Sequence, residues 1–80
     1  MKVYVIYDAM EIRMVQVTDT METAMKLAIN YITSNGYKVE SFNYDEDYTV
    51  IEVSDVIRIG GEIIEQEGAI TITSTNYLPE

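Results

Sequence analysis

A single segment of the chain has the apolar spacing of an α-helix, and this constrains the fold more than any other feature. Apolar residues recur there every three or four positions, at Met21, Met25, Ala28, Ile29 and Ile32. Asp19 is placed to cap the first turn, with Glu22 three positions later, and Asn35-Gly36 supplies a left-handed stop. The spacing predicts one amphipathic helix over about residues 20–34.

The rest of the chain has the composition of β-strands. The segments expected as strands are residues 2–8, 12–18, 37–44 and 48–59, a fifth that begins at Glu62, and a sixth that contains Ile70 and Ile72. Gly60-Gly61 predicts a two-residue hairpin turn, because both positions can adopt positive φ without strain. A further turn is expected at Glu67-Gly68. Asp55 falls among the apolar positions of its strand, which predicts a bulge near Ser54-Asp55.

The order β-β-α-β-β-β-β, with short connections, predicts an α+β domain in which one amphipathic helix packs on one face of an antiparallel sheet. A chain of 80 residues is long enough for a single domain, residues 1–80, and too short for two. One helix can cover only one face of the sheet. The other face is therefore expected to be solvated, or to be covered by a partner or a second copy of the chain.

The side chains on which most enzymes depend are missing. The chain has neither His nor Cys, which removes the commonest general base, the commonest zinc ligands and the most reactive nucleophile. Asn43, Asp45 and Asp47 alternate like the start of a calcium loop, but Tyr48 and Ser54 stand where that loop requires Gly and Glu. We therefore expect no enzyme, no cofactor and no metal site. Without cysteine and without a secretory or membrane segment, the chain is expected in the cytoplasm.

The acidic residues are concentrated in the second half of the chain. Residues 1–39 carry equal numbers of acidic and basic side chains, whereas Arg58 is the only basic residue of 40–80, so the whole net charge of −9 belongs to the second half. A pI near 4.2 repels nucleic acid and anionic lipid, so neither is expected as a direct partner. A field of one sign instead attracts a basic protein surface.

Carboxylates on one face of a strand follow one another at about 6.6–6.8 Å, so a row of them can imitate a row of phosphates. We therefore expect an acidic binding surface on the strands and turns after the helix. Tyr44 and Tyr48 flank its first turn and would supply apolar anchor area. The charged members of the predicted surface are Asp45, Glu46, Asp47, Glu52, Glu62, Glu65 and Glu67.

The overall plan resembles a known type of small protein. The opening Met1-Lys2-Val3-Tyr4-Val5-Ile6-Tyr7-Asp8, a helix beginning Thr20-Met21-Glu22-Thr23-Ala24 and an acidic β-rich second half are similar to small accessory proteins of bacteriophages and mobile elements. These include anti-CRISPR proteins and anti-restriction DNA mimics. The resemblance implies a non-enzymatic inhibitor that acts in the host cytoplasm on a nuclease or another nucleic-acid-binding complex.

A second hypothesis stays open beside this one. The chain could be a structural or regulatory subunit whose uncovered sheet face or strand edge pairs with a second copy, as in a homodimer, because an open sheet leaves such edges exposed. Tyr, Val and Ile would then form the interface. An acidic inhibitor predicts a complex that salt weakens, whereas self-association predicts a mass that rises with concentration.

Overall fold

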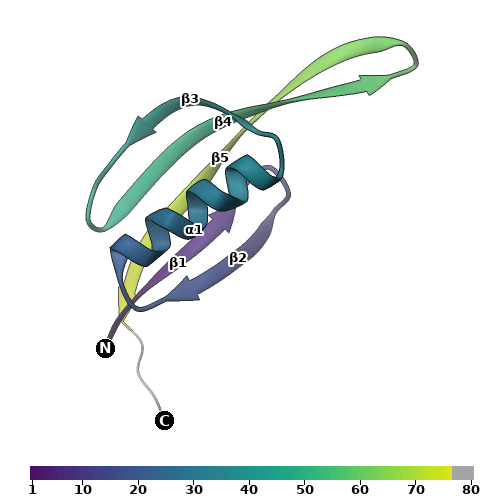
Figure 1. The fold of residues 1–80 in the computed structure, drawn as a ribbon. Coiled ribbons are helices and arrows are strands. Elements are labelled where there is room, and N and C mark those ends of the chain that lie inside the picture. The colour runs from purple at the N-terminus through teal and green to yellow at the C-terminus, as the bar shows by residue number, and fades with distance from the viewer. Residues whose placement is uncertain (77–80) are drawn as a thin grey trace.

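The computed structural model describes residues 1–76 as a five-stranded sheet with one helix (Figure 1). Its elements are β1 (Lys2–Asp8), β2 (Arg13–Thr18), α1 (Met21–Ser34), β3 (Lys38–Asn43), β4 (Tyr48–Ile59) and β5 (Glu62–Asn76). The strands lie in the order β2-β1-β5-β4-β3, and every neighbouring pair is antiparallel. The α+β class and the helix packed on one face of an antiparallel sheet are confirmed. Within residues 1–76, no helix has the length and hydrophobicity needed to cross a membrane.

The core lies between α1 and the face of the sheet that it covers. On the sheet side it consists of Ile6, Ile51, Val53, Ile70 and Ile72, all buried. Ala24, Ala28 and Ile32 of α1 are buried against them, whereas Ile29, expected on the apolar face of the helix, is 51% exposed. Small alanines on the buried side let the helix approach the isoleucines of the sheet closely.

The ends of α1 are fixed by local hydrogen bonds. Thr20, and not Asp19, is the N-cap: its Oγ1 accepts a hydrogen bond from Thr23 N at 3.1 Å. At the other end Asn35 is the C-cap and Gly36 has φ 71°, as the Asn35-Gly36 signal predicts.

Strand β5 is continuous where a turn was expected, so the sheet has five strands and not six. Glu67-Gly68 lies inside its 15 residues, and no turn separates the fifth predicted strand from the sixth. The glycine serves a close approach: a Cβ added at Gly68 would lie 2.7 Å from Met10 Cβ. The β1–β2 turn therefore packs directly onto the backbone of β5, and only glycine leaves room for it.

The bulge expected at Ser54-Asp55 is also absent, because β4 and β5 pair in unbroken register from Tyr48↔Thr73 to Ile59↔Glu62. The register shift lies instead in β3, between Val39 and Ser41. Gly60 and Gly61 form the predicted turn, with φ 58° and 83°.

Beyond the core, the end of the β4–β5 hairpin projects as a two-stranded arm, which we define as residues 55–67. Pairing of β3 with β4 ends at Lys38↔Ser54, and pairing of β1 with β5 ends at Asp8↔Ile70. Figure 1 shows this hairpin extending past the helix, and the molecule measures 51 × 25 × 17 Å. Asp55 is the first residue of the arm, which extends beyond the part of the sheet that α1 covers. Its side chain therefore lies outside the core without a bulge.

One carboxylate is buried at the end of β1. Asp8 is 0% exposed, and its Oδ1 accepts hydrogen bonds from Met10 N at 2.9 Å and Glu11 N at 3.1 Å. Its Oδ2 accepts from the hydroxyls of Tyr31 at 2.5 Å and Tyr37 at 3.2 Å. Because four donors reach it, a single side chain joins the β1–β2 turn, the helix and the segment that leads into β3.

Candidate protein-binding surface

The predicted binding residues lie in three different places. The first group, residues 44–47, forms the connection from β3 to β4, and Tyr48 is the first residue of β4. Glu52, Glu65 and Glu67 lie on the face of the sheet opposite to α1. Glu62 begins β5 at the tip of the arm, opposite Ile59, and alternation along the strand places its side chain on the other face.

Asp45 is used to build the β3–β4 connection. Its Oδ1 accepts hydrogen bonds from Asp47 N at 2.8 Å and Tyr48 N at 3.3 Å. Thr49, which is buried, donates its hydroxyl to the Asp45 carbonyl oxygen at 2.7 Å. These bonds are the pattern by which an aspartate closes a tight turn, so this carboxylate has a structural task.

Asp47 is held by neighbours from two other strands. Its Oδ1 accepts from Ser74 Oγ at 3.0 Å and lies 3.4 Å from Lys2 Nζ, and its carbonyl oxygen accepts from Ser74 N at 2.9 Å. The hydrogen bond from Ser74, and then Lys2, lower the pKa of this carboxyl below its usual range. Since Lys2 balances its charge, Asp47 adds little to a field that could attract a partner.

The face of the sheet away from α1 is hereafter the open face. Residues directly opposite in neighbouring strands share a face, and those two apart in one strand do so as well. Since Ile51 and Val53 face the helix, the intervening Glu52 faces away, together with Tyr48. Glu52 lies opposite Ala69, and Glu65 lies opposite Val56. Among the predicted residues, Tyr48, Glu52, Glu65 and Glu67 therefore share the open face.

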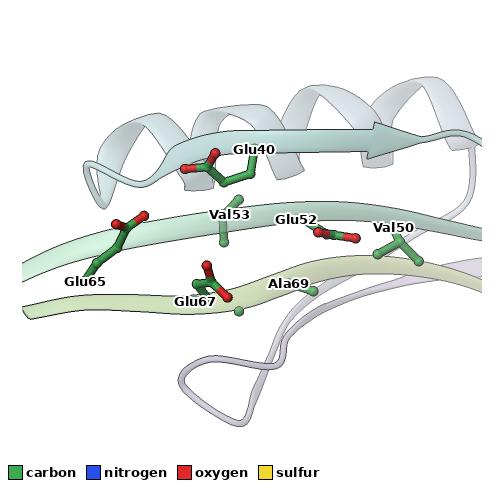
Figure 2. A pocket seen from close by; sticks show the side chains of 8 residues that line it. Glu40, Val50, Glu52, Val53, Glu65, Glu67 and Ala69 are labelled. Atoms are coloured by element: carbon green, nitrogen blue, oxygen red, sulfur yellow. The ribbon is translucent and has the colours of Figure 1, made fainter.

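Four glutamates surround one hollow on this face, which we call the glutamate hollow (Figure 2). They come from three neighbouring strands: Glu40 from β3, Glu52 from β4, and Glu65 and Glu67 from β5. The hollow has a volume of about 510 Å³, and its remaining lining residues are Val50, Val53, Gly68 and Ala69. Figure 2 shows the four glutamate side chains spread along the near side of the three strands, with α1 behind the sheet.

The charge of the glutamate hollow is predominantly negative. Among residues 1–76, those that line it include four carboxylates and no lysine or arginine. Lys38 Nζ lies 3.7 Å from Glu40 Oε1 at the β3 side, so the charge of Glu40 is partly balanced. Within residues 1–76, no ion pair joins Glu52, Glu65 or Glu67 to a basic side chain. Like charges gathered beside low-dielectric backbone reinforce one another's potential, so this part of the surface favours a cationic group.

Glu40 is a member of this site that the sequence did not indicate. Its Oε1 accepts a hydrogen bond from the hydroxyl of Ser54, which is buried, at 2.7 Å. This contact depends on β3 lying beside β4 with Lys38 opposite Ser54, and on the bulge that follows Val39. Neither the register nor the bulge leaves a recognisable signal in residues 37–44.

The carboxylates of residues 1–76 do not form a metal centre: no three side chains of the His, Cys, Asp or Glu type are grouped so as to hold a metal ion. Comparison of the chain with protein-family models, with curated proteins and with solved structures finds no match.

Proposed function

We propose that this chain is a non-enzymatic binding protein that docks its open face on a basic surface of another protein. The observation that carries the proposal is the convergence of four glutamates, from three strands, on one hollow, where only Glu40 is ion-paired to a basic side chain of residues 1–76. If these acids served only solubility, interspersed positive charge would do the same without the repulsion between them. A cationic partner relieves that repulsion on binding.

The layout of the open face fits such a partner. Glu65 and Glu67 are two residues apart on β5, so their Cα atoms are separated by about 6.8 Å, and the strand that carries Glu52 lies about 4.8 Å to the side. Tyr48 follows the same face of β4 and is 53% exposed, which adds an amphipathic ring to the acidic surface. Interfaces commonly combine an aromatic anchor with a charged rim.

The partner class follows from the chemistry of the surface. Basic clefts that accept rows of anions are the property of proteins that bind nucleic acids, so the proposed action is inhibition of such a protein by occupation of its cleft. Anti-CRISPR and anti-restriction proteins, which the chain resembles, include inhibitors of this kind. That this chain is one of them stays a prediction. Binding of this kind is fast and becomes weaker as salt screens the charges.

The experiment uses three versions of the chain as bait for proteins of a bacterial extract. One is the unaltered chain. The open-face variant removes the charge of three carboxylates on β4 and β5, by Glu52→Gln, Glu65→Gln and Glu67→Gln. The matched control removes as many charges from exposed sites on the β1–β2 turn and the start of α1, by Glu11→Gln, Asp19→Asn and Glu22→Gln.

The proposal predicts a basic protein that the unaltered chain and the control variant retain at low salt, and that the open-face variant does not. The same protein should be released when salt is raised from about 50 to 200 mM. Retention of the same proteins by all three versions would refute the proposal, because the location of the charge would then not matter.

A further inference from the structure

The arm has two strand edges with no neighbour among residues 1–76. On the β4 side, pairing with β3 stops at Ser54. On the β5 side, pairing with β1 stops at Ile70, followed by one hydrogen bond from Ala9 N to the Ala69 carbonyl oxygen at 2.9 Å. An exposed edge of this kind can accept a further strand from another chain.

Two hydrogen bonds fix which backbone groups of β5 point outward. Ala69 presents its carbonyl to the β1 side, and Ser74 donates its N–H toward the β4 side, to Asp47 O. Along an antiparallel strand the direction alternates with every residue. The N–H and C=O groups of Ile63, Glu65 and Glu67 therefore point away from β4, along the free edge of the arm.

The two edges of the arm differ in charge. The outward residues on the β5 edge include Glu65 and Glu67, whose side chains also line the glutamate hollow. By the same alternation and the register of β4 with β5, the outward residues on the β4 edge are Val56 and Arg58. A basic strand is therefore attracted to the β5 edge.

We propose that the β5 edge of the arm, over Glu62–Glu67, accepts an extended basic segment of a partner protein as an added strand. This inference rests on the proposed function and specifies how the partner binds. Backbone hydrogen bonds to Ile63, Glu65 and Glu67 would hold the segment, and its alternate side chains would project over the open face. Lysines or arginines at those positions would reach the carboxylates of Glu65 and Glu67.

A second copy of the chain fits this edge poorly. Symmetric antiparallel pairing of β5 with its own copy would place the Glu62, Glu65 and Glu67 carboxylates of one chain among those of the other. Like charges on adjacent strands destabilise a sheet, and acidic residues on an edge are a common means of preventing self-association. A basic segment turns the same charges into attraction.

The first test is amide hydrogen exchange on the unaltered chain, with a peptide of alternating Lys and Thr, blocked at both ends and long enough to span Glu62–Glu67. Strand addition predicts slower exchange at the amides of Ile63, Glu65 and Glu67 when the peptide is present. The amides of Val56 and Arg58, on the opposite edge of the same arm, are the matched control and should not change. Equal protection of both edges, or of neither, would refute the proposal.

The second test compares two variants at one position. Glu65→Thr and Glu65→Pro remove the same charge, but only proline removes the outward N–H, and it leaves the bonds between β4 and β5 in place. We expect the peptide to bind the proline variant about tenfold more weakly than the threonine variant. Equal affinities would contradict strand addition, and circular dichroism checks that both variants are folded.

The outcomes separate this inference from the proposed function. If the open-face charge variant loses the peptide while the proline variant matches the threonine variant, the acidic surface stands and strand addition is wrong. If the edge amides are protected but charge removal has no effect, strand addition stands and the acidic surface is wrong. A peptide that does not bind the unaltered chain contradicts both. If the chain forms a dimer through this edge as its concentration rises, the occupant is a second copy and the proposal of a basic segment is refuted.

Discussion

Replacement of Asp8 tests whether the buried carboxylate holds the helix to the sheet. In Asp8→Ala, the hydroxyls of Tyr31 and Tyr37 lose their acceptor, and so do the N–H groups of Met10 and Glu11. The two N–H groups belong to a turn that water can reach. The Tyr37 side chain is buried, so its hydroxyl has no ready substitute.

The expected loss follows from these contacts. A hydrogen bond to a charged group contributes about 1.5–3 kcal/mol, and the donor left unsatisfied in the interior costs about 1–3 kcal/mol. We expect Asp8→Ala to lower the free energy of unfolding by about 3–5 kcal/mol. A domain of 80 residues has about 4–12 kcal/mol in total, so this variant should be close to unfolding.

The assay is urea denaturation at neutral pH, followed by far-UV circular dichroism. With a slope of about 1 kcal/mol/M, the midpoint of Asp8→Ala should fall by about 3 M or more. Asp8→Asn keeps an acceptor for the two backbone N–H groups and offers an amide to the tyrosine hydroxyls, so it should cost about 1–2 kcal/mol. The reasoning is refuted if the free energy of unfolding of Asp8→Ala lies within about 1 kcal/mol of that of the unaltered chain, or if Asp8→Asn lowers it as much as Asp8→Ala does.

Three more predictions concern single sites. Burial, and then the negative charge of Asp8, raise the pKa of Tyr37 above its ordinary value of 10.0. The folded chain therefore keeps the Tyr37 proton at pH values above 10.0, where the unfolded chain loses it, so the free energy of unfolding should fall as the pH rises further. This fall should be less steep in Tyr37→Phe; urea titrations that give both chains the same dependence of the free energy of unfolding on pH would contradict this. Gly68→Ala should cost about 1–3 kcal/mol by collision with Met10, and the same change should cost less in a Met10→Gly background; a neutral Gly68→Ala would show that the turn is not packed on β5. Ile12 is 78% exposed at φ 55°, so Ile12→Gly should raise the thermal midpoint through relief of about 1 kcal/mol of strain, and a lower midpoint would contradict this.

Periodic signals in the sequence predicted most of the fold. The helix, the β1–β2 and β4–β5 hairpins and the Gly60-Gly61 turn could be predicted because each depends on residues close in sequence. Gly68 was misinterpreted, because a glycine that avoids a collision looks the same in sequence as a glycine that makes a turn. The position of Asp8 is a similar case: it shares the parity of Ile6, but only the tertiary arrangement shows the two tyrosines that bind it.

The binding surface was predicted in part, and its limits have a physical cause. Charge asymmetry indicated the second half of the chain, but the Asp45 carboxylate is engaged in building a turn and that of Asp47 is bonded to Ser74 and Lys2. Strand pairing decides which glutamates meet: Glu40 joins Glu52 only because β3 lies beside β4 in a shifted register. Contacts between residues far apart in sequence carry no local pattern, so they could not be predicted.

The proposal that the open face binds a cationic partner is tested most directly by an NMR titration of the chain with a lysine oligomer at low ionic strength. We predict that the largest amide shifts fall on the residues of the glutamate hollow, around Glu52, Glu65 and Glu67, and that they diminish as salt is added. Shifts centred on the β3–β4 connection, or spread evenly over the acidic residues of the whole chain, would contradict the proposal.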